Sequence, residues 1–198
     1  MTVFAIDRPL GRLVRTRQTK DAILAAALKI FSTRGYAEAG VRDIAGLARV
    51  NPALVTRYFG TKLQLFEVVL EANLDSEVFT RRPRAEFGIS VAKSFCASDA
   101  ETASAVPLLV FAAGDSAAAA IALRLLQRIV IAPLEAWFGT PDAAERTAQM
   151  LTVITGFFVY RLMLPVAPLA QQISPNMQSW LARTLQDIVD HKPGPAPG

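Results

Sequence analysis

The side chains with the clearest potential for chemistry lie in one short polar stretch. Asn51 and Pro52 are the residue types favoured at the N-cap and at the first position of a helix. In a helix over 52–59 the apolar residues share one face, which can be buried against neighbours that include Leu47, and the residues that face outward are Pro52, Ala53, Thr56 and Arg57. An arginine there can donate two hydrogen bonds to guanine O6 and N7, and a threonine methyl can contact thymine. This pattern favours recognition of base edges in duplex DNA.

Hydrogen-bond donors and cations flank this helix and are candidates for contacts with DNA phosphates. Asn51, with the free N–H groups at the start of the helix, can hold one phosphate. Three further residues are expected to contact phosphates nearby: Arg42, Tyr58 and Lys62. Upstream lies a basic segment that contains Arg12, Arg15 and Arg17. We expect this segment to be mobile, and either to reach an adjacent minor groove or to add counterion release.

The spacing of apolar residues predicts the helices that must hold these side chains. The first is expected over 19–34, with Thr19 as its N-cap and Gly35 in a left-handed conformation after its end. Three more are expected over 41–48, 52–59 and 62–78, the last capped by Thr61. Two short helices joined by a tight turn, with a third packed across them, form a helix-turn-helix. Such helix pairs also occur in proteins that do not bind DNA, so spacing alone leaves both interpretations open.

The distribution of charge supports a polyanionic partner. Residues 1–62 contain 11 Lys and Arg against 4 Asp and Glu, a net of +7, whereas residues 63–198 contain 10 against 13, a net of −3, which together give the chain's +4. The polyanion could be nucleic acid or a membrane surface. Because the positive charges are spread over several short helices and do not line one amphipathic face, membrane binding is disfavoured.

The fold class is expected to be all-α, with about nine helices. The chain has 198 residues, 52% of them hydrophobic, which is ample for a core, and strand signals are almost absent. The later helices are expected over 86–97, 101–113, 115–138, 142–164 and 174–190, after a break at 81–84. Pro107 and Pro133 should kink the helices that contain them. We expect no membrane span and no secretory signal, which predicts a cytoplasmic protein.

Enzymatic, metal-dependent and cofactor-dependent functions are disfavoured. The single cysteine, Cys96, and the single histidine, His191, are far apart, and no Ser/His/Asp set or glycine-rich phosphate loop is present. We therefore expect no cofactor, no metal and no catalytic residue. The alternative to a DNA-binding protein is a helical small-molecule or lipid-binding protein, or an enzyme, that uses the apolar remainder of the chain and has no affinity for DNA.

A stretch of the chain resembles the N-terminal DNA-binding region of the TetR/AcrR family of transcriptional regulators. It covers residues 16–70, and the matching motifs are ILAAALKIF, RGY, VRDIA, VNPALVTRYF and FGTKLQL. The later segment GDSAAAAIALRLLQRIVIAPLEAWFG is similar to one type of the family's C-terminal domain. The resemblance implies a basic arm and helix-turn-helix DNA-binding domain over 1–62 and an effector-binding and dimerisation domain over 63–190. The proline- and glycine-rich end predicts a disordered tail over 191–198. It further implies a homodimer that binds a palindromic operator, acts as a repressor and is released by a small apolar effector.

The resemblance also assigns roles by position. The residues that match positions commonly contacting DNA in the family are Arg42, Asn51, Thr56, Arg57, Tyr58 and Lys62. Two residues depart from the family pattern. Arg49 stands where a glycine is usual, so this turn is either strained by about 1 kcal/mol or built differently. Thr56 stands where an aromatic residue is usual, which puts one phosphate contact in doubt.

The effector pocket and the dimer interface can be predicted only from helical facing. Five residues are candidates for contact with an apolar effector: Phe95, Phe111, Ile129, Phe157 and Arg161. Buried aromatic residues are more often plain core, and Arg161 could instead make a dimer contact or extend its charge to solvent. The expected dimer faces are Leu151, Ile154, Phe158 and Leu162 on one helix, and Trp180, Leu181, Leu185 and Ile188 on another.

Overall fold

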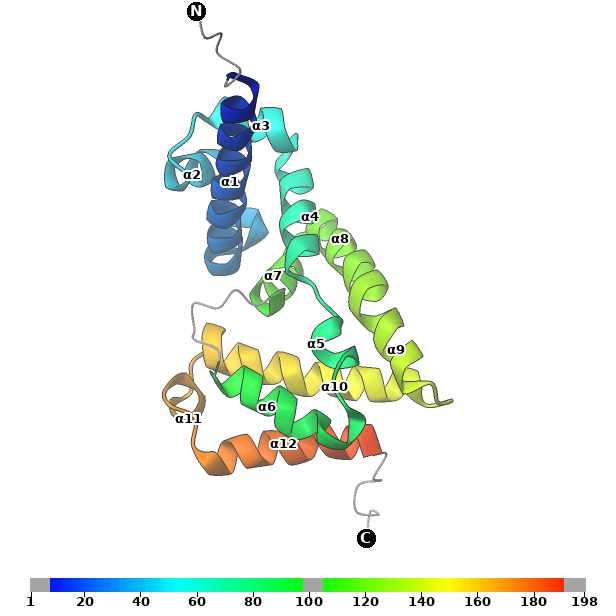
Figure 1. The fold of residues 1–198 in the computed structure, drawn as a ribbon. Coiled ribbons are helices and arrows are strands. Elements are labelled where there is room, and N and C mark those ends of the chain that lie inside the picture. The colour runs from blue at the N-terminus through cyan, green and yellow to red at the C-terminus, as the bar shows by residue number, and fades with distance from the viewer. Residues whose placement is uncertain (1–7, 98–104, 191–198) are drawn as a thin grey trace, which may run out of the picture. The chain divides into compact units, whose positions relative to one another are not determined.

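The fold is helical throughout the part of the chain that the structure describes. A computed structural model describes residues 8–97 and 105–190, with side chains from residue 14 onward, and these ranges contain no strand. The all-α prediction is therefore confirmed (Figure 1). The predicted tail over 191–198 and the start of the helix expected over 101–113 lie outside the described residues.

The helices follow one another with short connections. In the first half they are α1 (Arg8–Glu38), α2 (Val41–Leu47), α3 (Pro52–Phe59), α4 (Lys62–Asn73), α5 (Glu77–Thr80), the 3₁₀ turn η1 (Arg84–Glu86) and α6 (Phe87–Ala97). In the second half they are α7 (Ala105–Ala112), α8 (Ser116–Leu126), the π-helical turn η2 (Gln127–Ile131), α9 (Ala132–Phe138), α10 (Ala143–Phe158), the π-helical turn η3 (Val159–Met163), α11 (Ala167–Ala170) and α12 (Pro175–Asp190).

The chain divides into two compact units. The N-terminal unit comprises Met1–Glu71 and Leu108–Ala122, and the C-terminal unit comprises Ala72–Pro107 and Leu123–Gly198. The helix-turn-helix region lies entirely in the N-terminal unit. The functions expected for residues 1–62, DNA binding, and for residues 63–190, effector binding and dimerisation, remain predictions.

The first helix starts eleven residues earlier than the sequence pattern predicted. It begins at Arg8, so the basic segment that we expected to be mobile is helical. Thr19 is therefore not an N-cap: it lies inside the helix, and its hydroxyl donates to the carbonyl of Arg15 at 2.8 Å. The capping prediction failed because a threonine that could cap a helix can also bond back to the preceding turn.

The core of the N-terminal unit forms where α1 becomes apolar. Ile23, Ala27 and Phe31 are fully buried, and Phe31 packs edge-to-face on Phe66 of α4 with ring centroids 5.4 Å apart. The helical part of α1 ends where the sequence predicted, at Gly35, whose φ of 77° is positive. Its ψ of 169° is extended, so the chain turns sharply there before a last short turn over 36–38.

Several predicted helix boundaries differ from the observed ones. α4 ends at Asn73 and is followed by the separate short helix α5, so the helix expected over 62–78 is too long. Pro107 lies in the first turn of α7, where no backbone N–H is needed, so it does not interrupt the helix. Pro133 follows the π-turn η2, which accommodates the proline ring and the missing donor. The helix α11 lies in a segment that we expected to be a loop.

The C-terminal unit packs α6, α9, α10 and α12 around one apolar core. Gly88 of α6 allows close approach to α12, because a Cβ placed there would lie 2.0 Å from the carbonyl oxygen of Ala182. The buried Arg146 of α10 holds the end of α12. Its guanidinium donates to the carbonyls of Ile188, at 2.9 Å, and Val189, and it lies 4.4 Å from the ring centroid of Phe138. These contacts fix α10 against α12.

Within residues 8–97 and 105–190, one helical stretch meets the length and composition requirements of a membrane span. It runs from Ser116 to Phe138, and 28% of its most apolar window is buried. Core helices of soluble proteins meet the same requirements, so this is weak evidence for a membrane.

Candidate nucleic-acid interface

The turn between α2 and α3 has a well-defined backbone geometry. The N–H of Val50 donates to the carbonyl of Ala45 at 2.9 Å, and the N–H of Arg49 donates to that of Gly46 at 3.1 Å. This pair of bonds closes a helix through a residue in the left-handed region, usually glycine. Here that residue is Arg49, with a φ of 54°, the only positive φ among the described non-glycine residues. Of the two possibilities raised by the sequence, the strained turn is the one observed.

Asn51 and Pro52 start the recognition-helix candidate α3 as predicted. The Oδ1 atom of Asn51 accepts from the N–H of Ala53 at 2.9 Å, which caps the helix, and Pro52 occupies its first turn. Val55 is buried, whereas the predicted outward residues are exposed: Pro52, Ala53, Thr56 and Arg57. The sequence therefore placed the two faces of α3 correctly. Leu47 of α2, which we expected to help bury α3, is 48% exposed.

The ammonium group of Lys62 has partners inside the protein that the sequence did not reveal. It donates to the carbonyl of Tyr36 at 2.9 Å and lies 4.2 Å from the centroid of the Tyr36 ring. Lys62 thus ties the start of α4 to the end of α1. Thr61 caps α4 as predicted, in a reciprocal pair: its Oγ1 accepts from the N–H of Gln64 at 3.1 Å, and the Gln64 side chain accepts from the N–H of Thr61 at 2.8 Å.

Tyr58 is paired with a cation on α1. The Nζ atom of Lys20 lies 5.5 Å from the centroid of the Tyr58 ring, which is half-buried. Arg42, on α2, is exposed, and no described residue forms a hydrogen bond or an ion pair with its side chain. Lys20 was not among the predicted DNA-contacting residues. It lies one turn before Ile23, where the apolar pattern of the first helix begins, and this spacing could have indicated a position beside the helix-turn-helix.

The five effector candidates do not form one group within one unit. Phe95, Phe157 and Ile129 belong to the C-terminal core, where the Phe95 and Phe157 rings stack at 6.3 Å. Phe111 belongs to the N-terminal unit, where it lies against Gly35. Arg161 donates to the carbonyl of Leu169 at 2.9 Å, and its guanidinium carbon lies 6.0 Å from the centroid of the Phe157 ring.

Two titratable groups outside the helix-turn-helix are shifted by burial. Burial raises the pKa of the Tyr36 hydroxyl, and the carboxylate of Asp115 raises it further. Burial also raises the pKa of the Cys96 thiol, while the positive charge of Arg161 acts in the opposite direction. Both groups therefore stay neutral at physiological pH. No cluster of three or more potential metal ligands occurs among residues 8–97 and 105–190.

Comparison with known proteins identifies both halves of the chain. The family described as "Bacterial regulatory proteins, tetR family" matches residues 23–69, and the "Tetracyclin repressor-like, C-terminal domain" matches residues 85–189. The HTH-type transcriptional repressor Rv3405c of Mycobacterium tuberculosis is 46% identical over 70 residues, which are 34% of this chain and 35% of that protein. The repressor NicS of Pseudomonas putida is 40% identical over 60 residues, 30% of this chain and 28% of that protein. The chain thus matches about a third of the length of these relatives.

Solved structures share the fold over most of the chain. GusR of Salmonella enterica has a TM-score of 0.65 at 16% identity, and covers 93% of this chain and 98% of its own. A transcriptional regulator of Rhodococcus sp. Rha1 has a TM-score of 0.60 at 23% identity, over 86% of this chain and 94% of its own. The second family match alone spans more than half of the chain. The chain therefore belongs to the TetR family of transcriptional regulators, which are DNA-binding proteins and not enzymes.

Proposed function

We propose that this transcriptional regulator binds a palindromic operator as a homodimer through α3. The observation that carries the proposal is the exposed face of α3, because Thr56 and Arg57 point away from a helix whose Val55 side is buried. Thr56 and Arg57 would read base edges, and Asn51 with the first turn of α3 would contact a phosphate. Pro52, also exposed, would pack against the groove wall. The protein would act in the cytoplasm, where bacterial DNA is accessible.

The three side chains proposed to contact phosphates differ in how far they are engaged within the protein. Arg42 is exposed and its guanidinium is unpaired among the described residues, so it is available to a phosphate. Tyr58 is half-buried beside Lys20, which leaves its hydroxyl as the group that would reach DNA. Lys62 uses its ammonium on a carbonyl of α1, and would contact DNA only through its remaining N–H groups.

Selection of DNA from a random duplex library by the purified protein tests the proposal. The expected product is an inverted repeat, since a two-fold dimer reads two equivalent half-sites. Fluorescence anisotropy with the selected duplex should then show that Arg57→Ala loses roughly 1–3 kcal/mol of binding free energy and relaxes specificity at one base position. If no duplex is enriched at low salt, the proposed function is wrong.

We place the dimer interface in the C-terminal unit. Trp180 of α12 is 48% exposed and Tyr160 of η3 is 50% exposed, and large apolar groups left in water favour burial by a second copy. Some of the residues predicted for this interface are instead buried within the chain and cannot form it: Ile154, Leu181 and Leu185. Trp180→Lys should shift the protein from dimer to monomer in light scattering, with far-UV circular dichroism unchanged.

We further propose repression that is relieved by a small apolar effector bound in the C-terminal unit. The two relatives described above are named repressors, and a third, FasR of Mycolicibacterium smegmatis, is named an activator at 35% identity over 72 residues. An effector can release DNA only if it binds better to a form of the dimer whose half-site spacing does not fit the operator. Addition of an apolar ligand library to the DNA complex should identify compounds that lower the anisotropy.

A further inference from the structure

Resting on the proposed function, we propose that the first turns of α1 form a second DNA-contacting element, a helical basic arm over residues 8–20 that binds phosphates outside the groove entered by α3. The sequence of this arm has five Lys or Arg residues and no Asp or Glu. At 1.5 Å per residue, its length is about 20 Å. The arm would bind DNA backbone of any sequence, because phosphate contacts carry no base information.

The arm is not held by packing in its described part. None of the residues from 14 to 22 is buried, and burial on α1 starts at Ile23. Val14 is 56% exposed, and Arg15 and Arg17 are exposed. Most helical stability in proteins comes from burial of an apolar face, and residues 14–22 bury none, so contacts from outside the chain can add to the stability of this stretch.

The two described arginines of the arm have no acidic partner among the described residues. Neither Arg15 nor Arg17 makes an ion pair with a described residue, and the first turn of α1 holds no acidic residue. Like charges gathered on one stretch repel one another, and an external polyanion beside them turns this repulsion into attraction. That is the charge complementarity expected for DNA.

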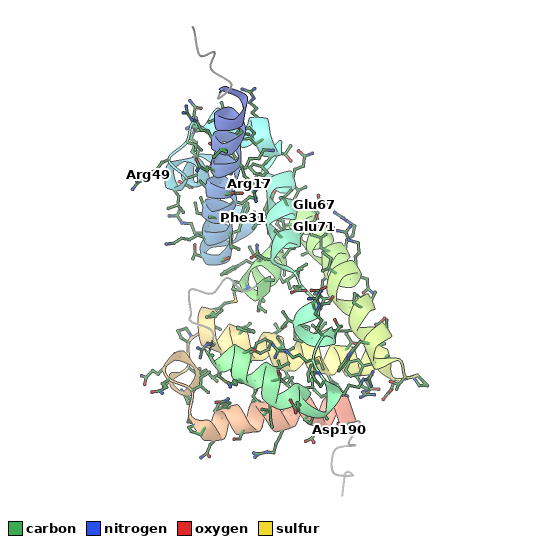
Figure 2. All side chains as sticks on the ribbon, viewed as in Figure 1. Arg17, Phe31, Arg49, Glu67, Glu71 and Asp190 are labelled. Carbon is green, nitrogen blue, oxygen red and sulfur yellow. The ribbon has the colours of Figure 1, made fainter. Side chains whose placement is uncertain are left out.

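The arm is continuous with the proposed recognition surface. Lys20 lies against Tyr58, so the last turn of the arm contacts α3 directly. Figure 1 shows the start of α1, in dark blue, at the same end of the N-terminal unit as α3, and Figure 2 labels Arg17 on this helix. Because α1 continues as one helix from the arm to the first buried residue, Ile23, the packed part of α1 sets the direction of the arm.

The test compares the salt dependence of DNA binding between charge variants of the same helix. The double variant Arg15→Gln/Arg17→Gln removes two described charges of the arm. Lys29→Gln, also exposed and on α1, removes one charge about two turns into the helix-turn-helix core and serves as the matched control. Affinity is measured by anisotropy over a series of salt concentrations, with a random-sequence duplex and with the duplex selected by the wild-type protein.

The inference predicts a smaller salt slope for the arm variant on both duplexes. Each lost phosphate contact lowers the slope of log K against log salt by about 0.9, so the double variant should lose between about 0.9 and 1.8 while Lys29→Gln stays at the wild-type value. Circular dichroism checks that both variants are folded. An unchanged slope in the double variant, or an equal fall in Lys29→Gln, overturns the arm.

Failure of the arm and failure of the proposed function give different results. If Arg57→Ala loses affinity for the selected duplex but the arm variant behaves as wild type, the function stands and the arm is wrong. If the salt slope of the arm variant falls on both duplexes while Arg57→Ala binds the selected duplex like the wild type, the arm contacts DNA and the assignment of base recognition to α3 is wrong. If the wild-type protein binds neither duplex at low salt, both are wrong.

Discussion

Replacement of Arg49 by glycine should stabilise the helix-turn-helix. Arg49 has a φ of 54° in the turn after α2. The left-handed conformation costs an L-residue roughly 1–2 kcal/mol because Cβ crowds the following carbonyl. Glycine removes that cost, but it gains conformational freedom in the unfolded chain, worth about 0.4–1 kcal/mol. Taking the middle of the two ranges, the expected net gain is about 0.5–1 kcal/mol.

The matched control is Arg49→Ala, which removes the same charge and the same long side chain but keeps Cβ. The side chain of Arg49 projects into solvent from the turn, as Figure 2 shows, so no packing is lost in either variant. Two contributions then distinguish alanine from glycine: the backbone strain of the folded turn and the greater freedom of glycine in the unfolded chain.

Amide hydrogen exchange in peptides from α2 and α3 is the appropriate assay. Both tryptophans, Trp137 and Trp180, belong to the C-terminal unit, so tryptophan fluorescence does not report directly on this turn. Exchange governed by opening of the region should be about two- to fivefold slower in Arg49→Gly than in Arg49→Ala, which corresponds to 0.5–1 kcal/mol. Equal protection in the two variants, or weaker protection with glycine, would refute the assignment of strain to Arg49.

Three further predictions follow from individual contacts. Gly88→Ala should destabilise the C-terminal unit by about 1–3 kcal/mol, because the new Cβ meets the backbone oxygen of Ala182. The midpoint of urea unfolding should therefore fall. An unchanged midpoint would contradict the close approach of α6 and α12. Lys62→Gln should reduce the protection of α4 amides from hydrogen exchange, by about 1 kcal/mol for a lost hydrogen bond to a carbonyl, and a variant as protected as wild type would show that this bond is unimportant. Cys96 should react with iodoacetamide more slowly than free cysteine at pH 8, because its raised pKa lowers the thiolate fraction. Arg161→Gln should slow the reaction further, because it removes the positive charge that lowers the pKa of Cys96. Faster alkylation in that variant would contradict this effect of Arg161.

The sequence predicted the faces of short helices better than the limits of long ones. On α3 the cap residue Asn51, the buried Val55 and the exposed Arg57 were all correctly placed, since a cap, a proline and a 3.6-residue period act locally. The start of α1 was not predicted, because Thr19 fits both an N-cap and a hydroxyl bonded back to the preceding turn. Local signals of equal strength cannot decide between such alternatives.

Tertiary partners of polar side chains were the second kind of feature that the pattern could not reveal. Lys62 and the carbonyl it binds on Tyr36 are 26 positions apart, and no periodicity links them. Arg146 is 5% exposed and binds the end of α12, although arginine is a residue type that usually lies at the surface. Helical periodicity also does not show to which unit a helix belongs. Phe111 lies in the N-terminal unit, and the other four effector candidates lie in the C-terminal unit.

Lys62 has an internal partner that limits its contact with DNA. Its ammonium donates to the carbonyl of Tyr36, so only its remaining N–H groups are open to a phosphate. The exposed cations of α2 and α3 have no such engagement among the described residues, and with the arm of α1 they would supply most of the released counterions. A measured slope that fell by a full 0.9 in Lys62→Gln, with α4 still protected, would show instead that its ammonium leaves α1 to contact a phosphate when DNA binds.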